Sequence, residues 1–217
     1  MWTETLSRAL TPVLVTCALI VTGLVIYQHF FEASSAGDGR YVEDWQSLAA
    51  TGHRLGPKEA AVDIVVFFDY QCPYCHESMA TLDTIQQRYA DSVAVILRHL
   101  PLPNHPQAFP AARAAECAAQ QGRFSTYHSL LFDNRSVLGN ISWDSLAAET
   151  GVQDLDAFRS CVANGSPDDR IKRDIRAAQE LVIRSVPTIV VNGRLLSGAP
   201  PTTVLDRLVQ NALDRAG

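Results

Sequence analysis

The chain has 217 residues and a net charge of −5, with 47% hydrophobic and 19% charged residues. This length has room for one domain that carries an insertion. The acidic balance, together with the lack of a Lys/Arg cluster, excludes the basic surface that nucleic-acid binding needs. The composition is that of a globular protein with one very apolar segment.

That apolar segment spans Ala9 to Phe31, which is 23 residues without a formal charge when His29 is counted as neutral. As a helix it would extend about 34 Å, enough to cross a hydrocarbon core of about 30 Å. We therefore predict a transmembrane anchor over residues 9–31. The alternative is a cleaved signal peptide with Ser34-Ser35-Ala36 as its cleavage site, but the apolar core is longer than such peptides usually have.

The charges beside this segment predict its orientation. Arg8 precedes it, whereas Glu32 and Asp38 follow it, and positive charge tends to stay in the cytoplasm. We expect residues 1–8 in the cytoplasm, a small polar linker over 32–40, and the rest on the periplasmic side of the cytoplasmic membrane. That compartment is oxidising.

Two cysteines follow the first strong strand signal. The apolar run Val62–Phe68 is rich in β-branched and aromatic residues and predicts a buried strand. The chain then delivers Cys72-Pro73-Tyr74-Cys75 and a helical pattern over 76–89. Proline suits the first position of a helix, where its missing N–H costs nothing. Cys72 is therefore expected at a helix N-terminus.

The rest of the chain predicts a second strand, a block of helices, and a closing hairpin and helix. Four prolines keep 99–110 irregular, and Asn192-Gly193 between two apolar runs is a strong hairpin signal. The expected elements are a short helix at 41–50, strands at 93–98, 188–191 and 194–196, and helices at 111–121, 124–132, 143–150, 155–162, 168–183 and 201–215. This order gives βαβ and ββα halves around a helical insertion at about 107–183. It predicts an α/β thioredoxin fold over residues 41–217.

At this point the chain resembles the DsbA-like thiol:disulfide oxidoreductases, which have a thioredoxin fold with a helical insertion. The resemblance covers the chain from about Trp45 to the end and is carried by the segments 67–75, 111–132 and 186–193. It implies a protein thiol:disulfide oxidoreductase that needs no bound cofactor. Its partners would be exported client proteins with cysteine pairs, and a membrane quinone-linked or other thiol redox partner that reoxidises it.

Cys72 and Cys75 are the expected catalytic residues. In a C-x-x-C at a helix start, the first sulfur is stabilised as a thiolate and meets the substrate, and the second resolves the mixed disulfide. Pro73 and Tyr74 tune the potential through the N–H groups that reach the sulfur. His76 either helps to hold the Cys72 thiolate or is a plain exposed helix residue.

Val186 and Pro187 are the expected substrate-binding residues. The resemblance implies that Pro187 is a cis-proline facing the two cysteines, and that Val186 offers its backbone to an incoming peptide. Taken alone, this proline predicts a trans residue that opens an edge strand. Valine before the proline resembles the DsbA oxidases, whereas the isomerase relatives and many anchored relatives have threonine there.

One position departs from the family pattern. Family members commonly carry a buried acid six residues before the first cysteine, and here that position is Val66. Such a carboxylate can relay the proton of the resolving thiol. We therefore expect slower deprotonation of Cys75, or a relay by water or another group. Asp69 is the nearest acid in sequence, but a cap of the turn is an equally good reading of it.

Cys117 and Cys161 lie in two predicted helices of the insertion. They form either a structural disulfide, which an exported domain and some relatives favour, or two buried free thiols that act as small hydrophobes. Cys17 lies in the apolar segment and is expected to face lipid or to pack within the anchor.

Other classes of function stay open. Residues 72–76 also satisfy C-x-x-C-H, the attachment signature of c-type haem, with His99, His105 or His128 as the second axial ligand. The strand before the motif and the Pro187 hairpin argue against haem. A zinc site lacks a second ligand pair, so no metal is expected. The remaining alternatives are a disulfide reductase or isomerase of the same fold, and an anchored redox sensor or binding module.

Overall fold

The computed structural model describes residues 20–23 and 39–216. Residues 20–23 are helical, and within the described ranges no helix has the length and apolar character that a membrane span requires. Of the predicted anchor at 9–31, only residues 20–23 are described, and of the linker at 32–40 only residues 39 and 40. Cys17 lies outside the described residues. The anchor, the linker and the place of Cys17 stay predictions.

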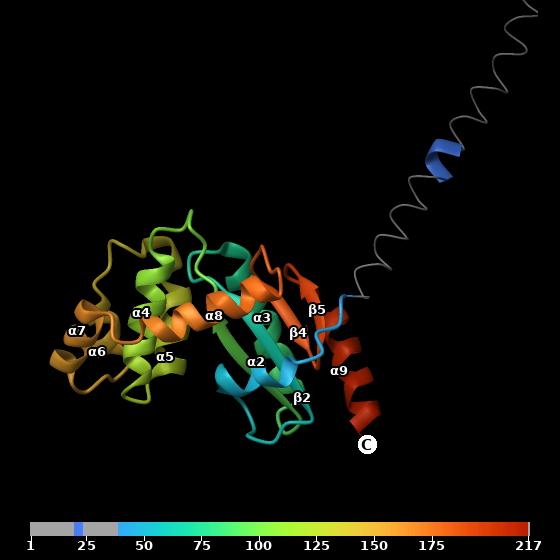
Figure 1. Cartoon of the computed structure of the whole chain (residues 1–217), viewed down its shortest axis with the longest axis horizontal. Coiled ribbons are helices and arrows are strands. Elements are labelled where there is room, and N and C mark those ends of the chain that lie inside the picture. The colour runs from blue at the N-terminus through green and yellow to red at the C-terminus, as the bar shows by residue number, and fades with distance from the viewer. Residues whose placement is uncertain (1–19, 24–38, 217) are drawn as a thin grey trace, which may run out of the picture. The chain divides into compact units, whose positions relative to one another are not determined.

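A five-stranded sheet lies at the centre of the unit formed by residues 40–217, in the order β1-β3-β2-β4-β5 (Figure 1). The strands are β1 (His53–Leu55), β2 (Val62–Phe68), β3 (Val93–His99), β4 (Thr188–Val191) and β5 (Arg194–Ser197). β2 and β3 are parallel, and the other pairs are antiparallel. Every residue of β3 is buried, as is every residue of β2 except Asp63. Central strands covered on both faces need such continuous apolar runs.

Helices cover both faces of the sheet. They are α2 (Trp45–Thr51), α3 (Pro73–Arg88), α4 (Ala108–Ala119), α5 (Phe124–Asp133), α6 (Trp143–Glu149), α7 (Leu155–Asn164), α8 (Asp168–Glu180) and α9 (Thr202–Ala216), with a short 3₁₀ helix η1 at Arg135–Val137. Side chains alternate along β3. Arg98 points to the face of α2 and α8, where it binds the Leu48 carbonyl and Asp174. Leu97 points the other way, toward α3.

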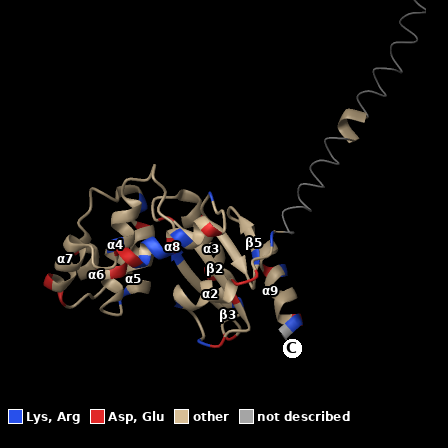
Figure 2. Cartoon of the chain, in the orientation of Figure 1, with Lys and Arg blue, Asp and Glu red and all other residues tan. Residues whose placement is uncertain are grey.

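The helical insertion follows β3 and ends before β4. Helices α4 to α7 lie beside the sheet as a block, and α8 brings the chain back to pack against β3 (Figure 1). α8 carries charges of both signs along its length (Figure 2). Its residues Ile171 and Asp174 are nevertheless buried, so one face of this charged helix is fixed on the domain. The predicted elements occur in the predicted order.

One strand has no counterpart among the predicted elements. Residues 53–55 form the edge strand β1, which pairs with residues 95–97 of β3, although the sequence suggests only a lead-in there. Gly52 allows the close approach, because a Cβ at this position would lie 2.2 Å from the Ile96 side chain.

The start of the insertion also differs from the prediction. Helix α4 begins at Ala108, inside the segment 99–110 that its prolines were expected to keep irregular. Pro110 falls in the first turn of α4, where the missing N–H removes no helical hydrogen bond.

Candidate active site

The two cysteines of the C-x-x-C motif lie at the start of α3. Cys72 is the N-cap residue and Pro73 is the first helical residue, as predicted. Cys72 is 4% exposed and Cys75 is fully buried, and both are free thiols. The unsatisfied N–H groups of the first helical turn therefore lie beside the Cys72 sulfur, while Cys75 is enclosed within that turn.

The loop before β4 brings Val186 and Pro187 to the same place. The peptide bond between them is cis, as the resemblance implied, and both residues are buried. The Cys72 thiol donates a hydrogen bond to the Val186 carbonyl oxygen at 3.7 Å. The structure thus brings the predicted catalytic cysteine and the predicted substrate-binding pair together.

The surroundings of the two thiols shift their pKa values in opposite directions. A hydrogen bond from Cys75 lowers the pKa of Cys72 to about 6, and backbone N–H groups of Tyr74 and Cys75 act in the same direction, against burial and the charge of Asp69. Burial raises the pKa of Cys75 far above its ordinary value, and the hydrogen bond to Cys72 adds to the rise. Near neutral pH, Cys72 carries the negative charge and Cys75 stays a thiol.

Tyr74 and His76 are on the exposed side of α3. Tyr74 is 62% exposed, so it acts on Cys72 through its backbone. The His76 ring is exposed and stacks on Phe132, with centroids 6.1 Å apart. Among the described residues, no hydrogen bond or ion pair joins His76 to Cys72. The structure therefore favours the plainer of the two readings of His76, an exposed helix residue.

Asp69 holds the turn that precedes Cys72. Its buried carboxylate accepts hydrogen bonds from the backbone N–H groups of Gln71 at 2.7 Å and Leu102 at 2.8 Å, and its Oδ2 lies 2.9 Å from His105 Nδ1. Gln71 in turn accepts a hydrogen bond from the Gln107 N–H at 2.5 Å. The turn is thereby tied to the segment that leads into α4.

Tyr70 ties the same turn to α5. Its hydroxyl lies 3.0 Å from His128 Nδ1, and both side chains are buried. Burial lowers the pKa of His128 to about 3. Since His128 and His105 are bound to protein groups in this way, and His99 belongs to a cluster described below, the histidines considered as haem ligands all have partners within the domain.

Val66 occupies the position where many relatives carry an acid. It is fully buried in β2, opposite Leu97 of β3 and Ile189 of β4. This apolar setting between two neighbouring strands suits valine and would penalise a carboxylate. The buried acid whose charge acts on both thiols is instead Asp69.

Comparison with known proteins identifies the family. A protein-family model described as "Thioredoxin" matches residues 48–211. The chain belongs to this thioredoxin family. Its predicted α/β thioredoxin fold with inserted helices is thereby confirmed.

Solved structures of thioredoxin-fold proteins resemble this thioredoxin domain closely. A thioredoxin-like oxidoreductase from Silicibacter pomeroyi DSS-3 is 28% identical, with a TM-score of 0.65, over 79% of this chain and 96% of that chain. BdbD from Bacillus subtilis (19% identity, TM-score 0.70, 82% and 97% coverage) and the catalytic domain of Proteus mirabilis ScsC (24%, 0.67, 78% and 95%) share the fold. With the free cysteine pair at the start of α3, the family match and the 28% identical oxidoreductase confirm the predicted class, a thiol:disulfide oxidoreductase of thioredoxin fold.

The thioredoxin domain also resembles part of several much longer proteins. The Na(+)/H(+) antiporter NhaA 3 of Salinispora tropica is 36% identical over 165 residues, which are 76% of this chain and 25% of that protein. The antiporter NhaA of Herminiimonas arsenicoxydans is 31% identical over 147 residues, 68% and 23% respectively. The chain spans about a quarter of the length of these relatives, so their named activity does not transfer to it.

The predicted disulfide in the insertion is confirmed. Cys117 of α4 is bonded to Cys161 of α7, with Cα atoms 5.8 Å apart and a sequence separation of 44. Both residues are buried. The thioredoxin domain thus has a structural cross-link that is separate from its Cys72–Cys75 pair.

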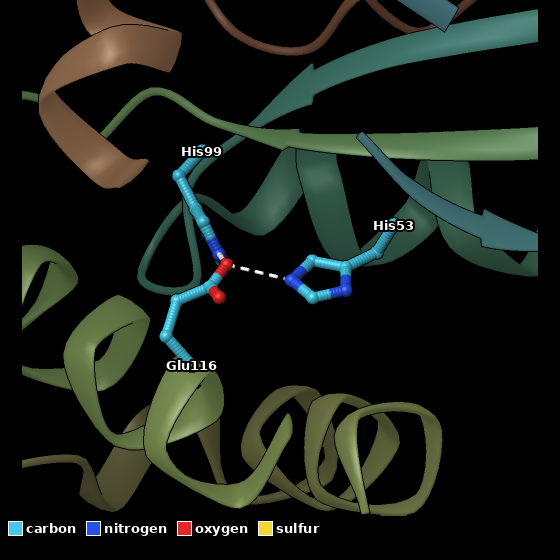
Figure 3. Close-up of side chains that lie close together, drawn as sticks. All are labelled: His53, His99 and Glu116. Atoms are coloured by element: carbon cyan, nitrogen blue, oxygen red, sulfur yellow. Dashed lines mark hydrogen bonds and ion pairs between the residues drawn. The ribbon is translucent and has the colours of Figure 1, made fainter. Parts of the chain in front are cut away.

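One group of described side chains has the composition of a metal site (Figure 3). His53, His99 and Glu116 place ligand atoms within 4.8 Å of one another. Both imidazole Nε2 atoms contact the same Glu116 oxygen, at 2.6 and 2.9 Å, and Arg170 Nε lies 3.1 Å from it. Burial alone would raise the pKa of Glu116, but the two histidine hydrogen bonds lower it well below its ordinary range. A guanidinium at the coordinating oxygen opposes a metal cation, so we assign an internal ion-pair network.

A cavity of about 650 Å³ runs along α3. Its walls come from α3, α5, β1 and β3 and include His76, Asp83 and Phe132. Neither Cys72 nor Cys75 lines it. The cysteine pair therefore lies outside this cavity, and Cys72 contacts the Val186 loop instead.

Proposed function

We propose that this protein is a dithiol oxidase that introduces disulfides into exported client proteins. The observation that carries the proposal is the contrast between the two thiols at the start of α3. Cys72 has a pKa lowered to about 6 and faces the Val186 carbonyl, whereas Cys75 is fully buried and stays protonated. A stabilised Cys72 thiolate favours the reduced pair, which makes its disulfide oxidising.

The reaction proceeds in two exchanges. A client thiolate attacks Cys72 of the Cys72–Cys75 disulfide, forming a client–Cys72 disulfide and releasing Cys75, which takes up a proton. A second client thiolate then attacks the client sulfur and releases Cys72 as a stable thiolate. The client loses two electrons and gains a disulfide, and the cysteine pair gains those electrons.

The second part of the proposal concerns location and partners. Residues 9–31 anchor the protein in the cytoplasmic membrane, with the thioredoxin domain on the periplasmic side, and a quinone-linked membrane protein or another thiol partner reoxidises Cys72 and Cys75. The length and apolar character of residues 9–31 support this location. The likeness of the thioredoxin domain to segments of proteins named as antiporters supports a location of this domain at a membrane.

Two alternatives make different predictions for the same site. A reductase or isomerase needs a less oxidising pair, and a redox sensor would exchange thiols without turning over clients. The lowered pKa of Cys72 favours the oxidase over the reductase, and valine at position 186 resembles the oxidases over the isomerases.

The test uses the full chain in detergent, first oxidised and then mixed with a reduced, unfolded protein that has one native disulfide. We expect stoichiometric disulfide formation by the wild type and none by Cys72→Ser. Equal client oxidation by both proteins would refute the proposal. In intact cells first treated with a membrane-impermeant reductant, labelling of Cys72 by a membrane-impermeant maleimide tests the location. Labelling only after lysis would contradict it.

A further inference from the structure

Asp69 lies between the two catalytic thiols and the insertion. Its backbone carbonyl accepts a hydrogen bond from the Cys72 N–H at 3.2 Å. A backbone hydrogen bond from Asp69 to the Cys75 sulfur lowers the pKa of Cys75, whereas the side-chain charge of Asp69 raises it. Its carboxylate is fully enclosed, and His105, which holds it at 2.9 Å, has a side chain only 22% exposed. A buried acid therefore lies within the turn that carries both thiols.

The carboxylate of Asp69 acts against negative charge on both sulfurs. Its charge raises the pKa of Cys72 and that of Cys75. Because the carboxylate is out of contact with water, solvent screens it little. The N–H groups of Gln71 and Leu102, together with His105, keep it in place.

We propose that Asp69, held by His105, is a positioning residue that keeps Cys75 protonated in the client–Cys72 mixed disulfide and so slows the attack of Cys75 on Cys72. This inference rests on the proposed function for its role in the cell, since it concerns the intermediate of that reaction. The intermediate has two exits. Attack by Cys75 returns the client unoxidised, whereas attack by the second client thiol completes the client disulfide.

The role is opposite to that of a proton relay. A relay carboxylate would take the proton from Cys75 and speed its attack, so removing it would slow the step. Asp69 is bound by three donors, which occupy its oxygens and leave it a fixed negative charge. Removing that charge should speed the step.

The step can be isolated with glutathione. Reduced protein is mixed with oxidised glutathione, which forms a glutathione–Cys72 disulfide and releases one glutathione. Cys75 then loses its proton to solvent and attacks Cys72, so the Cys72–Cys75 bond forms and the second glutathione leaves as a thiolate and is protonated. Acid quenching and mass spectrometry give the rate of this second step between pH 5 and 9.

Three variants are compared with the wild type. Asp69→Asn keeps the shape but removes the charge, and His105→Ala removes one of the three groups that hold the carboxylate in place. Asp174→Asn is the matched control, because Asp174 is also buried, accepts a backbone hydrogen bond from His99 and pairs with an arginine, but does not act on either thiol.

We expect Asp69→Asn to speed the second step several-fold to tenfold at pH 7 and to move its pH profile to lower pH. His105→Ala should move the profile the opposite way, and Asp174→Asn should leave it in place. A slower step or an unmoved profile in Asp69→Asn would overturn the inference. If the wild type forms no glutathione disulfide at all, the proposed function itself fails, which is a separate outcome.

Discussion

The Cys72 thiol donates a hydrogen bond to the Val186 carbonyl oxygen, 3.7 Å away and 114 positions later in the chain. A thiolate has no proton to donate, so this carbonyl becomes free when Cys72 ionises. It can then accept a hydrogen bond from the backbone of a client that approaches the sulfur. The same residue pair thus links the charge state of Cys72 to the surface that we assign to clients.

The two active-site cysteines should have distinct variant behaviour. Cys75→Ser removes the resolving thiol, so client proteins should accumulate as disulfides on Cys72 and be visible on non-reducing gels of membrane extracts. Cys72→Ser should trap none, because the buried Cys75 is inaccessible to clients. Trapping through Cys75 in the Cys72→Ser variant would show that the roles are reversed.

The acidity of Cys72 predicts a pH dependence for the reduced protein. Thiolate absorbance at 240 nm should titrate with a midpoint about pH 6, well below the ordinary thiol value of 9.0. A lowered folded pKa stabilises the reduced state above the unfolded value, and this gain is lost as pH falls through about 6. Chemical denaturation between pH 5 and 8.5 should therefore show the free energy of unfolding of the reduced protein rising relative to that of the oxidised protein as pH rises. A pH-independent difference would contradict the assignment.

The buried His128 predicts acid sensitivity of the fold. Its pKa is about 3 in the folded protein against an ordinary 6.5. Below pH 6.5 the unfolded chain binds the extra proton, so this contribution to stability falls as pH drops from 6.5 toward 3, by up to about 1.4 kcal/mol per pH unit. His128→Gln keeps a polar group near Tyr70 and should flatten this slope in urea unfolding, whereas the exposed control His76→Gln should not.

The disulfide of the insertion should stabilise the fold without affecting the redox site. Replacing both Cys117 and Cys161 by alanine should lower the free energy of unfolding by about 4 kcal/mol on the chain-entropy account of a loop of this length. The alkylation rate of Cys72 at pH 7 should stay the same in the folded fraction. A change in that rate would show that the insertion transmits strain to the thiols.

Much of the fold was predictable because its signals are local. The buried strands β2 and β3 are continuous apolar runs, the hairpin has its Asn-Gly turn, and Pro73 marks the start of α3. The strand β1 was not predictable in the same way. Residues 53–55 are only partly buried, so they lack the pattern of a strand, and their pairing with β3 depends on the space that Gly52 provides.

The active site likewise has a part that the sequence predicts and a part that it does not. The sequence shows Cys72, Cys75 and the Val186–Pro187 pair as motifs, and the family resemblance predicted that they lie together. The contacts of Asp69 are not visible, because His105 lies 36 positions away in a proline-rich loop with no periodic pattern. Likewise, nothing local in the sequence indicates that Tyr70 meets His128. Such pairs are set by how the insertion packs on the active-site turn.

The central claim is that Cys72 and Cys75 form an oxidising dithiol pair, and their reduction potential tests it most directly. The pair should be equilibrated with glutathione at pH 7 in the full chain, with the Cys117–Cys161 bond intact. The lowered pKa of Cys72 predicts a potential shifted by several tens of millivolts from about −270 mV toward about −120 mV, the value of strong oxidants. A potential near about −270 mV, typical of thioredoxin reductants, would contradict the account.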